Sequence, residues 1–293
     1  MLRSIMLYTW SWPVADGHYT WSLGREAVPT CSSLLPMTTS LPQSLSQVDP
    51  PSCNETESAF THIYEDHLWG SGDSLSGDGS TFSTTKALCN VVRIAVAMVF
   101  EEKSKMGDAP SMTLLDGPSG DWYWMPHCLK SIESSLPKGA TLHYHGMDIA
   151  QPALDLAEKH RHKLGNKIGQ AIQVVPFKQV DLANIGEMTA ATSGIKFDLV
   201  VCHDALQHNP LQGARQILDN FNSLGKYLVI DVDTVSDNFR DIQVGEVRCI
   251  DLQRPPVNAR PLCLDENAKE NKGPNGAKEG EWFGVYQLPM AWS

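Results

Sequence analysis

Residues 113–121 read Thr-Leu-Leu-Asp-Gly-Pro-Ser-Gly-Asp, and this stretch decides the fold. The apolar run ends in Asp116 and enters a turn with two glycines and a proline, which predicts a buried strand that leaves a sheet. Glycine has no Cβ, so the backbone N–H groups of such a turn can approach a ligand closely. We expect a helix to begin near Trp122 and to reach about Ser135, with an N-terminal end that favours anionic groups.

The acidic residues of this turn narrow the class of ligand. Asp116 and Asp121 would repel the phosphates of a dinucleotide, because like charges at short range are unfavourable. An aspartate at the end of the strand can instead accept a charge-assisted hydrogen bond from an ammonium group. The turn therefore suits a zwitterionic amino-acid ligand better than a pyrophosphate.

Four more segments have the apolar character of strands and finish in aspartate, namely Leu142–Asp148, Ile172–Asp181, Phe197–Asp204 and Lys226–Asp231. The third of these is nearly continuous in its apolar run, as is typical of a parallel strand covered on both faces. Strands that alternate with helical stretches predict an α/β, doubly wound sheet with its ligand at the carboxyl ends of the strands. Trp282–Leu288 is expected to return as a last strand.

The order of these motifs resembles class I S-adenosylmethionine-dependent methyltransferases, through Leu115–Met125, Gly146–Ile149, Asp181-Leu182 and Phe197–His208. A subgroup of that family with upstream Trp-Gly and Ser-Gly-x-Gly-Ser signatures is the closer match, here Trp69-Gly70 and Ser76–Ser80. The resemblance covers about residues 60–265 and 282–288. Ser119 stands where the subgroup typically has cysteine, a near-isosteric change. The 32 residues from Asp116 to Asp148 exceed the spacing of ~20 in a dinucleotide unit, which leaves the register of the second strand open.

The resemblance implies a Rossmann-like, mostly parallel seven-stranded sheet with one antiparallel strand, helices on both faces and an N-terminal helical cap. It implies methyl transfer from S-adenosyl-L-methionine to a small-molecule or carbohydrate-like acceptor. Two other functions stay open. One is a nicotinamide-dependent oxidoreductase, which the incomplete Gly-x-Gly-x-x-Gly pattern disfavours. The other is a non-catalytic, methyltransferase-like binding module.

Each predicted contact to the cofactor matches a chemical group. Asp116 is expected to bind the ammonium group, Asp148 the ribose hydroxyls and Asp181 the adenine amino group. A tryptophan of the Trp122-Tyr123-Trp124 run can favour the sulfonium by cation–π attraction, and the glycine-containing Ser76–Ser80 loop suits a lid. The predicted cofactor-binding residues are Asp116, Gly117, Gly120, Asp121, Trp122, Asp148, Ile149, Asp181, Leu182 and Cys202.

His203, Asp204 and His208 follow the fourth strand, where a methyl acceptor would lie, and they are the predicted catalytic residues. Histidine is the side chain most easily adjusted to take a proton near neutral pH. A structural interpretation also stays open, in which Asp204 caps a helix and His208 packs on the sheet. No metal site is predicted, because His143 and His145 lack a third ligand at suitable spacing.

Composition restricts the partners and the compartment. The chain has 293 residues and a formal net charge of −11, with no run of lysines or arginines, which argues against nucleic-acid binding. Its seven cysteines include no Cys-x-x-Cys, a pattern typical of reduced thiols in a cytoplasmic protein. No apolar run is long enough to cross a bilayer. The uncharged stretch Ser4–Ala15 leaves a short N-terminal targeting segment open.

Changes in residue composition and periodicity along the chain predict its domain organisation. Residues 1–57 are rich in Ser, Thr and Pro without sustained periodicity, which is typical of a flexible leader. The predicted methyltransferase domain is 58–293, with a helical cap at 58–110. Residues 240–265 are expected to form antiparallel strands and loops, and the polar stretch 266–281 a mobile insertion.

Overall fold

A computed structural model describes seven parts of the chain, at 53–70, 72–107, 110–164, 167–233, 238, 240–264 and 281–290. The chain separates into two units, Met1–Asp49 and Pro50–Ser293, and the described residues belong to the second. The predicted leader up to residue 52 and most of the predicted insertion lie outside the described residues. The first described helix, α1 (Cys53–Glu65), begins within the segment expected to be leader.

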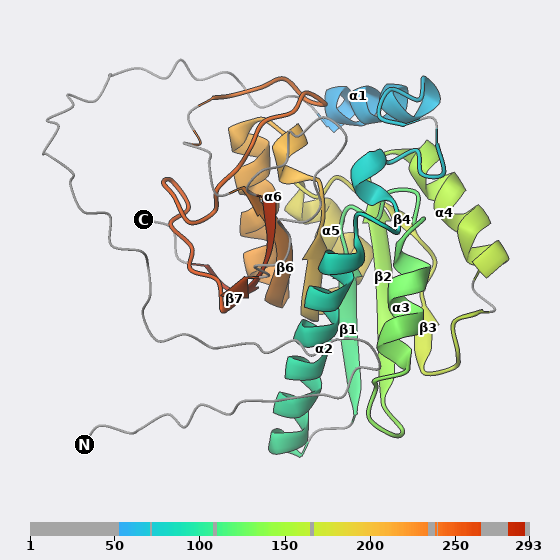
Figure 1. Ribbon diagram of the computed structural model, residues 1–293. Coiled ribbons are helices and arrows are strands. Elements are labelled where there is room, and N and C mark those ends of the chain that lie inside the picture. Colours follow the sequence, from blue (N-terminus) through green and yellow to red (C-terminus); the bar gives the residue numbers. More distant parts are fainter. Residues whose placement is uncertain are drawn as a thin grey trace, which may run out of the picture. The chain divides into compact units, whose positions relative to one another are not determined.

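One mixed sheet forms the centre of the described unit, in the order β3-β2-β1-β5-β6-β8-β7, with β4 paired to β2 (Figure 1). The pairs from β3 to β6 are parallel, and β8 runs antiparallel to both β6 and β7. The predicted doubly wound α/β sheet with one antiparallel strand is therefore confirmed. Its strands are β1 (Ser111–Asp116), β2 (Thr141–Asp148), β3 (Ile172–Val174), β4 (Lys178–Gln179), β5 (Phe197–Cys202), β6 (Gly225–Asp233), β7 (Cys263–Leu264) and β8 (Glu281–Gln287).

The count of eight strands instead of seven has a local cause. The expected third strand, Ile172–Asp181, is divided into β3 and β4, and both pairs are parallel to β2. Pro176 lies between them and has no N–H group to donate to a ladder, so pairing stops and resumes two residues later. Asp148 pairs with Gln179, and Asp116 pairs with Gly146. This register resolves the second strand as predicted, with Asp148 as its last residue.

Helices cover both faces of the sheet. Right-handed crossovers place α3 and α4, which lead outward from β1 to β3, on one face, and α5 and α6, on the return path, on the other. Figure 1 shows α2 with α3 in front of the strands and α6 behind them. The helices are α2 (Lys86–Met106), α3 (Met125–Glu133), α4 (Gln151–Leu164), α5 (Ile185–Thr192) and α6 (Leu211–Leu224). None of the helices in the described ranges is both long and apolar enough to span a bilayer.

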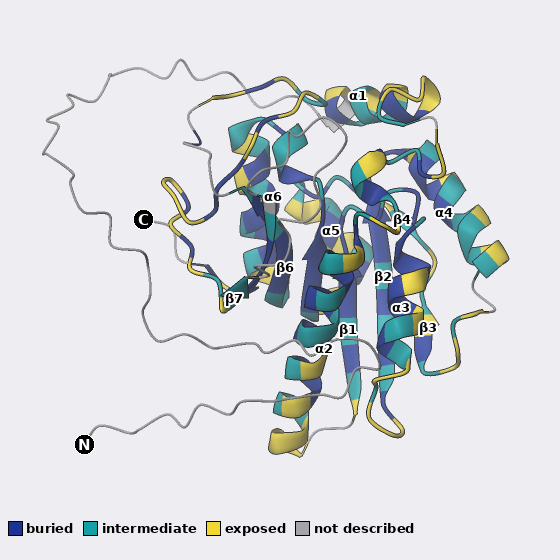
Figure 2. Cartoon of the chain, viewed as in Figure 1, coloured by how far each residue is buried: buried dark blue, intermediate teal, exposed yellow. Residues whose placement is uncertain are grey.

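The core follows from the alternation of side chains across the strands. Leu115, Val200 and Ile230 point to the face covered by α5 and α6 and belong to one buried cluster that includes Met188 and Phe221 from those helices. Figure 2 shows the central strands as the most buried part of the unit, with exposure concentrated on helix surfaces and loops. The rigid sheet therefore fixes where the residues that follow each strand emerge.

The glycine turn after β1 is longer than expected. α3 begins at Met125 and not near Trp122, so Asp121, Trp122 and Tyr123 belong to the turn. Trp122 adopts a left-handed backbone conformation with φ 56°, as does Gly120 with φ 53°. Two such residues close together prevent the helix from starting earlier, because left-handed φ values are incompatible with a right-handed helix.

The antiparallel strands expected within 240–265 are largely absent from the described residues. Only β7 forms there, and the remainder is turns and extended loop. Prolines at 255, 256 and 261 remove backbone donors from the segment. Side chains replace the ladder, because Asn238 Nδ2 donates to the Asp251 carbonyl at 2.7 Å and Asn238 Oδ1 accepts from the Asp251 N–H at 2.8 Å.

The prediction that the cysteines are reduced thiols is wrong for one pair. Cys89 on α2 and Cys128 on α3 form a disulfide across 39 residues of sequence. The packing of α2 against α3 brings the two residues together, with Cα atoms 5.5 Å apart. A bridge between two packed helices has no local spacing motif, so the sequence pattern does not reveal it.

Candidate functional site

One pocket lies at the carboxyl ends of the parallel strands, where the strand order reverses between β1 and β5. Open α/β sheets bind ligands at this kind of switch point, because the loops on either side diverge to opposite faces. The pocket encloses ≈ 790 Å³ of empty space, part of it open to solvent, within the ~300–1,000 Å³ range of small-molecule sites. The predicted residues that line it are Gly120, Asp121, Asp148, Ile149, Asp181, Leu182, His203, Asp204 and His208.

Asp148 is held rigidly at the end of β2. Its carboxylate accepts the Gly120 N–H at 3.0 Å through Oδ2 and the Ala150 N–H at 2.9 Å through Oδ1. Burial raises its pKa to about 6, although these backbone donors oppose the shift. Each carboxylate oxygen can accept more than one hydrogen bond, so Asp148 retains acceptor capacity toward the pocket it lines.

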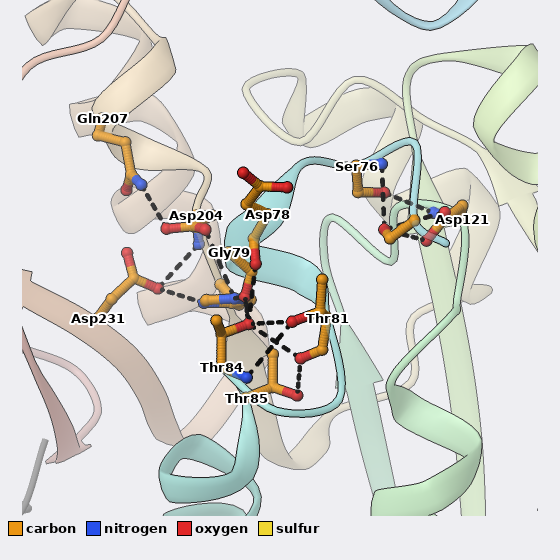
Figure 3. Close-up of polar contacts among 12 residues, drawn as sticks. Ser76, Asp78, Gly79, Thr81, Thr84, Thr85, Asp121, Asp204, Gln207 and Asp231 are labelled. Carbon is orange, nitrogen blue, oxygen red and sulfur yellow. Dashed lines mark hydrogen bonds and ion pairs between the residues drawn. The ribbon is translucent and has the colours of Figure 1, made fainter. Parts of the chain in front are cut away.

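Asp121 fastens the segment before α2 onto the glycine turn. Its carboxylate accepts hydrogen bonds from Ser74 Oγ at 3.0 Å and from the Leu75 N–H at 2.8 Å. In return, the Asp121 N–H donates to Ser76 Oγ at 2.9 Å, and the Tyr64 hydroxyl lies 2.7 Å from the same oxygen. We call residues 74–80 the tether loop. Figure 3 shows Ser76 and Asp121 joined in this way.

Gly120 is the point of closest approach between the turn and the tether loop. An added Cβ would lie 2.5 Å from Ser76 Oγ and 3.4 Å from the Tyr64 hydroxyl, and φ is +53°. Only glycine fits this position without displacing Ser76, both for space and for backbone conformation. The predicted close backbone approach at Gly120 therefore serves the loop that covers the pocket as well as any ligand inside it.

Four predicted cofactor residues lie behind the pocket wall and not along it: Asp116, Gly117, Trp122 and Cys202. Trp122 is fully buried, with its ring 5.4 Å from that of Phe177 and 5.9 Å from that of Tyr144. Within the Trp122-Tyr123-Trp124 run, the tryptophan that lines the pocket is Trp124, two residues further along the turn. Cys202 is fully buried among the residues under α6.

Asp116 is turned toward the sheet. The Tyr144 hydroxyl of β2 donates to its Oδ2, and the Gly117 N–H that follows donates to the Val201 carbonyl at 3.0 Å. Burial raises the pKa of Asp116 to about 7, which the Tyr144 hydrogen bond only partly offsets. In this arrangement its carboxyl group links β1 to β2.

Asp181 and Leu182 follow β4 and line the pocket on the side of α6. Asp181 Oδ1 accepts the Ala183 N–H at 2.8 Å, and the Asp181 N–H donates to Glu187 Oε2 at 2.9 Å. Asn220 of α6 donates to the Leu182 carbonyl at 2.8 Å. Contacts from α5 and α6 thus fix both residues in place.

His208 ends the short 3₁₀ helix η3 (Leu206–His208) after β5. Its Nδ1 lies 3.0 Å from the Glu246 carbonyl, and its ring packs on that of Trp69 with centroids 4.5 Å apart. A carbonyl oxygen only accepts, so Nδ1 carries the proton and Nε2 carries the lone pair in the neutral ring. This is the tautomer that a general base requires, with the ring held in one orientation by Trp69.

His203 has acidic or carbonyl oxygens at both ring nitrogens. Nδ1 lies 3.2 Å from Asp231 Oδ1, while Nε2 lies 3.2 Å from the Gly79 carbonyl and 3.6 Å from Asp204 Oδ2. Asp231 Oδ1 also accepts the Asp204 N–H at 2.9 Å. Donor atoms of His203, Asp204 and Asp231 lie within 4.8 Å of one another, a composition that could also bind a metal ion. Figure 3 shows Asp231 and Asp204 beside Gly79 of the tether loop.

The predicted cofactor-binding and catalytic residues leave out several residues of the site, although the Trp122-Tyr123-Trp124 run and the Ser76–Ser80 loop were singled out as segments. Tyr64, Trp69, Ser76 and Trp124 line the pocket, and Asp231 supports it. Asp231 had a usable signal, because it ends a predicted strand as Asp116 and Asp148 do. We call α1 and the tether loop, with the described residues between them, the roof of the pocket. The signal for the roof residues was weaker, because the Trp-Gly and Ser-Gly-x-Gly-Ser signatures mark the segment without indicating which side chains turn inward.

Comparison with known proteins finds no matching family model and no matching curated protein. Solved structures are similar at low identity. Magnesium protoporphyrin IX methyltransferase from Synechocystis PCC 6803, with bound SAM, is 19% identical with a TM-score of 0.38, covering 69% of this chain and 83% of that one. A SAM-dependent methyltransferase from Methanosarcina mazei is 15% identical with a TM-score of 0.42, covering 62% and 94%. An O-methyltransferase family protein from Burkholderia thailandensis is 13% identical with a TM-score of 0.39, covering 80% and 69%. These are distant likenesses, so the assignment of function rests on the pocket's own residues.

Proposed function

We propose that this chain is an S-adenosyl-L-methionine-dependent methyltransferase that acts on a small-molecule or carbohydrate-like acceptor. The observation that carries the proposal is the anchored carboxylate of Asp148 beside Gly120, in a pocket at the switch point of the sheet. A rigid carboxylate at the end of the second strand is suited to accept two ribose hydroxyls. Asp181 and Leu182 lie one strand further out, where an adenine ring attached to that ribose would extend.

The charge of the pocket supports the same cofactor. The described residues that line it include no lysine or arginine but four aspartates, Asp121, Asp148, Asp181 and Asp204. S-adenosylmethionine is a net cation, whereas the pyrophosphate of a nicotinamide dinucleotide is an anion that these carboxylates repel. The acidic lining therefore favours the sulfonium cofactor over the oxidoreductase alternative.

A buried hydroxyl also fits a ligand in the pocket. Ser119 Oγ is buried in the pocket wall without a hydrogen-bond partner among the described residues. A buried polar group that lacks a partner is costly, by ~1–3 kcal/mol, so a ligand that accepts from Ser119 would recover that energy. An amino-acid carboxylate is such an acceptor.

The acid-rich lining also restricts the acceptor molecule. Carboxylates without neighbouring lysine or arginine disfavour acceptor molecules that have a net negative charge, while neutral hydroxyl compounds meet no repulsion. Trp69, Trp124 and Phe60 supply apolar surface for such a molecule. We therefore favour a neutral, hydroxyl-bearing acceptor.

His208 is the general base in this proposal. When bound, the cofactor supplies a methyl group activated by its sulfonium. His208 Nε2 takes the proton of the acceptor hydroxyl, while Nδ1–H donates to the Glu246 carbonyl and stabilises the resulting cation. Trp69 keeps the ring in place, and Trp124 and Ser76 of the tether loop line the same pocket.

Calorimetry tests the cofactor. We expect S-adenosylhomocysteine and S-adenosylmethionine to bind with saturable heat and NAD to give none. Saturation by NAD alone would favour the oxidoreductase. Binding of the sulfur ligands without turnover, across a panel of neutral hydroxyl acceptors, would favour the non-catalytic binding module.

Substitution of His208 tests the base. His208→Gln should lower turnover by ~10²–10⁴ at unchanged cofactor affinity, because general-base assistance has that magnitude. Turnover of the unchanged protein should also fall as acid protonates the ring. Full turnover by His208→Gln would remove the base from the mechanism and leave His208 a structural role.

A further inference from the structure

Both nitrogens of His203 face oxygen atoms that can only accept hydrogen bonds. Nδ1 meets the Asp231 carboxylate and Nε2 meets the Gly79 carbonyl, each at 3.2 Å. A neutral imidazole has one N–H and one lone pair, so either neutral tautomer places a lone pair against one of these oxygens. Only the doubly protonated ring donates to both partners at once.

The surroundings of the ring favour that charge. Two carboxylates approach it, Asp231 on β6 and Asp204 next in sequence, and the carboxyl group of Asp116 on β1, which burial keeps partly protonated, lies nearby. The thiol of Cys202 precedes it, and the edge-to-face rings of Trp124 and Phe283 lie 5.9 and 6.1 Å from its centroid. An imidazolium among carboxylates is stabilised by each of them.

The partner of Nε2 belongs to the tether loop. Gly79 is the middle residue of the 3₁₀ helix η1 (Asp78–Ser80), 124 residues before His203 in sequence. Its carbonyl also accepts from Thr84 Oγ1 at 2.8 Å, within the same loop region. Thr84, which follows the loop in sequence, thus holds the local shape of the loop, and the contact from His203 fastens the loop to the end of β5.

Asp231 contacts the other ring nitrogen of His203, Nδ1. Its Oδ1 accepts both from His203 Nδ1 and from the Asp204 N–H, and Asp204 has a left-handed φ of 50°. Left-handed backbone at a non-glycine residue persists where neighbouring contacts fix it. One carboxylate oxygen therefore orients two consecutive residues at the mouth of the pocket.

We propose that Asp231 and a doubly protonated His203 are positioning residues, which dock the tether loop over the pocket through the Gly79 carbonyl. His203 is then a poor general base. To accept a proton it would first have to release one, and that would break its hydrogen bond to Asp231 or to the Gly79 carbonyl. This assigns the two histidines after β5 different tasks: His208 moves a proton and His203 holds the roof in place.

Nuclear magnetic resonance of the ¹⁵N-histidine-labelled protein without ligand tests the charge. We expect both His203 ring nitrogens to carry protons at pH 7. Asp231→Asn should lower the doubly protonated fraction at the same pH, because the amide removes a neighbouring negative charge. A neutral His203 ring in the unchanged protein would overturn the proposal.

Hydrogen exchange of the loop tests the docking. His203→Gln and Asp231→Asn should each speed exchange of the amides at 76–82 by at least tenfold, with β1 and β5 still protected. His162→Gln, at an exposed position of α4, is the matched control and should leave the loop unchanged. Unchanged loop exchange in both variants with a folded sheet would overturn the proposal.

Divalent cations distinguish docking from metal binding by the same three side chains. Addition of Mg²⁺ or Mn²⁺ should leave the His203 ring signals unchanged, apart from general salt effects. Displacement of a ring proton by either ion would overturn the proposal in favour of a metal site. All three measurements use the protein without cofactor, so they stand whether or not the methyltransferase assignment holds.

Discussion

Three aspartates near the carboxyl ends of β2, β1 and β6 have different tasks because their neighbours differ. Asp148 receives two backbone N–H groups and lines the pocket, Asp116 accepts the Tyr144 hydroxyl inside the sheet, and Asp231 faces His203. All three are strand-terminal acids in the sequence, so the pattern predicts their location but not their partners. The partners come from Tyr144, Gly120 and His203, which lie 28 residues away in sequence in each case.

The first prediction concerns Asp148. Asp148→Asn should weaken S-adenosylhomocysteine binding by one to two decades, because a hydrogen bond to a charged group contributes ~1.5–3 kcal/mol. Affinity of the unchanged protein should also fall as the pH drops below about 6, where the carboxyl group becomes protonated. Calorimetry over pH 5–8 measures both, with Asp155→Asn on the exposed side of α4 as the control. The same pH dependence in Asp148→Asn would contradict this assignment.

The second prediction concerns Asp116 and stability. Its pKa is raised to about 7 in the folded protein, so between the ordinary pKa and 7 the folded state holds a proton that the unfolded state has lost. The stabilisation of the folded state that the Asp116 carboxyl group contributes therefore falls as the pH rises from its ordinary pKa to about 7. Asp116→Asn should remove that fall, and its stability relative to the unchanged protein should improve by up to ~1.4 kcal/mol per pH unit. Urea unfolding at pH 4.5, 5.5 and 6.5 measures the difference, and a constant difference would refute the argument.

At the residue scale, the tryptophan assignment shows where sequence reasoning ends. In the aromatic run after Asp121, Trp122 is the residue that the sequence predicts to bind the cofactor. The left-handed conformation at Trp122 turns its side chain into the core, and Trp124 then faces the pocket. A positive φ at a bulky residue is rare and cannot be predicted from residue type.

At the scale of elements, the glycine turn and the tether loop form one unit. Asp121 on the turn forms hydrogen bonds with Ser74, Leu75 and Ser76 on the loop. Gly120 lies so close to Ser76 that an added Cβ would clash with it. The loop in turn reaches β5 through Gly79. The first strand's turn and the pocket's roof are therefore expected to move together.

The third prediction tests this unit with two glycines. Gly120→Ala forces a left-handed alanine and places its Cβ 2.5 Å from Ser76 Oγ, whereas Gly139→Ala has φ +79° and no neighbour within 4 Å. Both variants should lose ~1–2 kcal/mol of stability from the backbone alone. Only Gly120→Ala should also weaken cofactor binding and speed hydrogen exchange in the tether loop. Equal cofactor affinity in the two variants would show that Ser76 adapts without cost.

Most elements could be predicted, because apolar strand runs and periodic helices reflect burial directly. The exceptions have identifiable causes. Pro176 divides one strand into two, and the prolines of 254–261 prevent strands that hydrophobic residues alone suggested. The bridge between Cys89 and Cys128 depends on the packing of α2 on α3, which single-sequence patterns do not encode.

At the scale of the whole molecule, the pocket draws on residues from α1 to α6, so a bound ligand should stabilise the unit globally. The fourth prediction is that S-adenosylhomocysteine at a hundredfold excess over its Kd adds ~2.7 kcal/mol, which raises Tm by about 5–10 °C. His208→Gln should keep this shift, since it alters the proposed base alone. Asp148→Asn should lose much of it at the same ligand concentration. Thermal scanning of the three proteins measures the shifts, and loss of the shift in His208→Gln would mean that this histidine binds the cofactor.

The sequence predicts the residues that line the pocket less completely than it predicts the strands of the sheet. Residues that follow a strand, such as Asp181 and His208, could be placed because the parallel strands all end at one edge of the sheet. Tyr64 and Trp69 could not, because their approach depends on how α1 and its following loop cross the top of that edge. That crossing is set by individual contacts, such as Tyr64 with Ser76 and Trp69 with His208.

The order of the pocket's parts along the chain has a consequence for its synthesis. The roof, from α1 and the tether loop, leaves the ribosome before any strand of the floor, while the residues that fasten it, His203 and Asp231, emerge more than a hundred positions later. Phe60, Tyr64 and Trp69 pack near Ala150 and α4, so the nascent chain carries an uncovered aromatic cluster until that helix emerges. Chaperone dependence should therefore be greatest for chains arrested before α4 has emerged, and should end once β6 can pair.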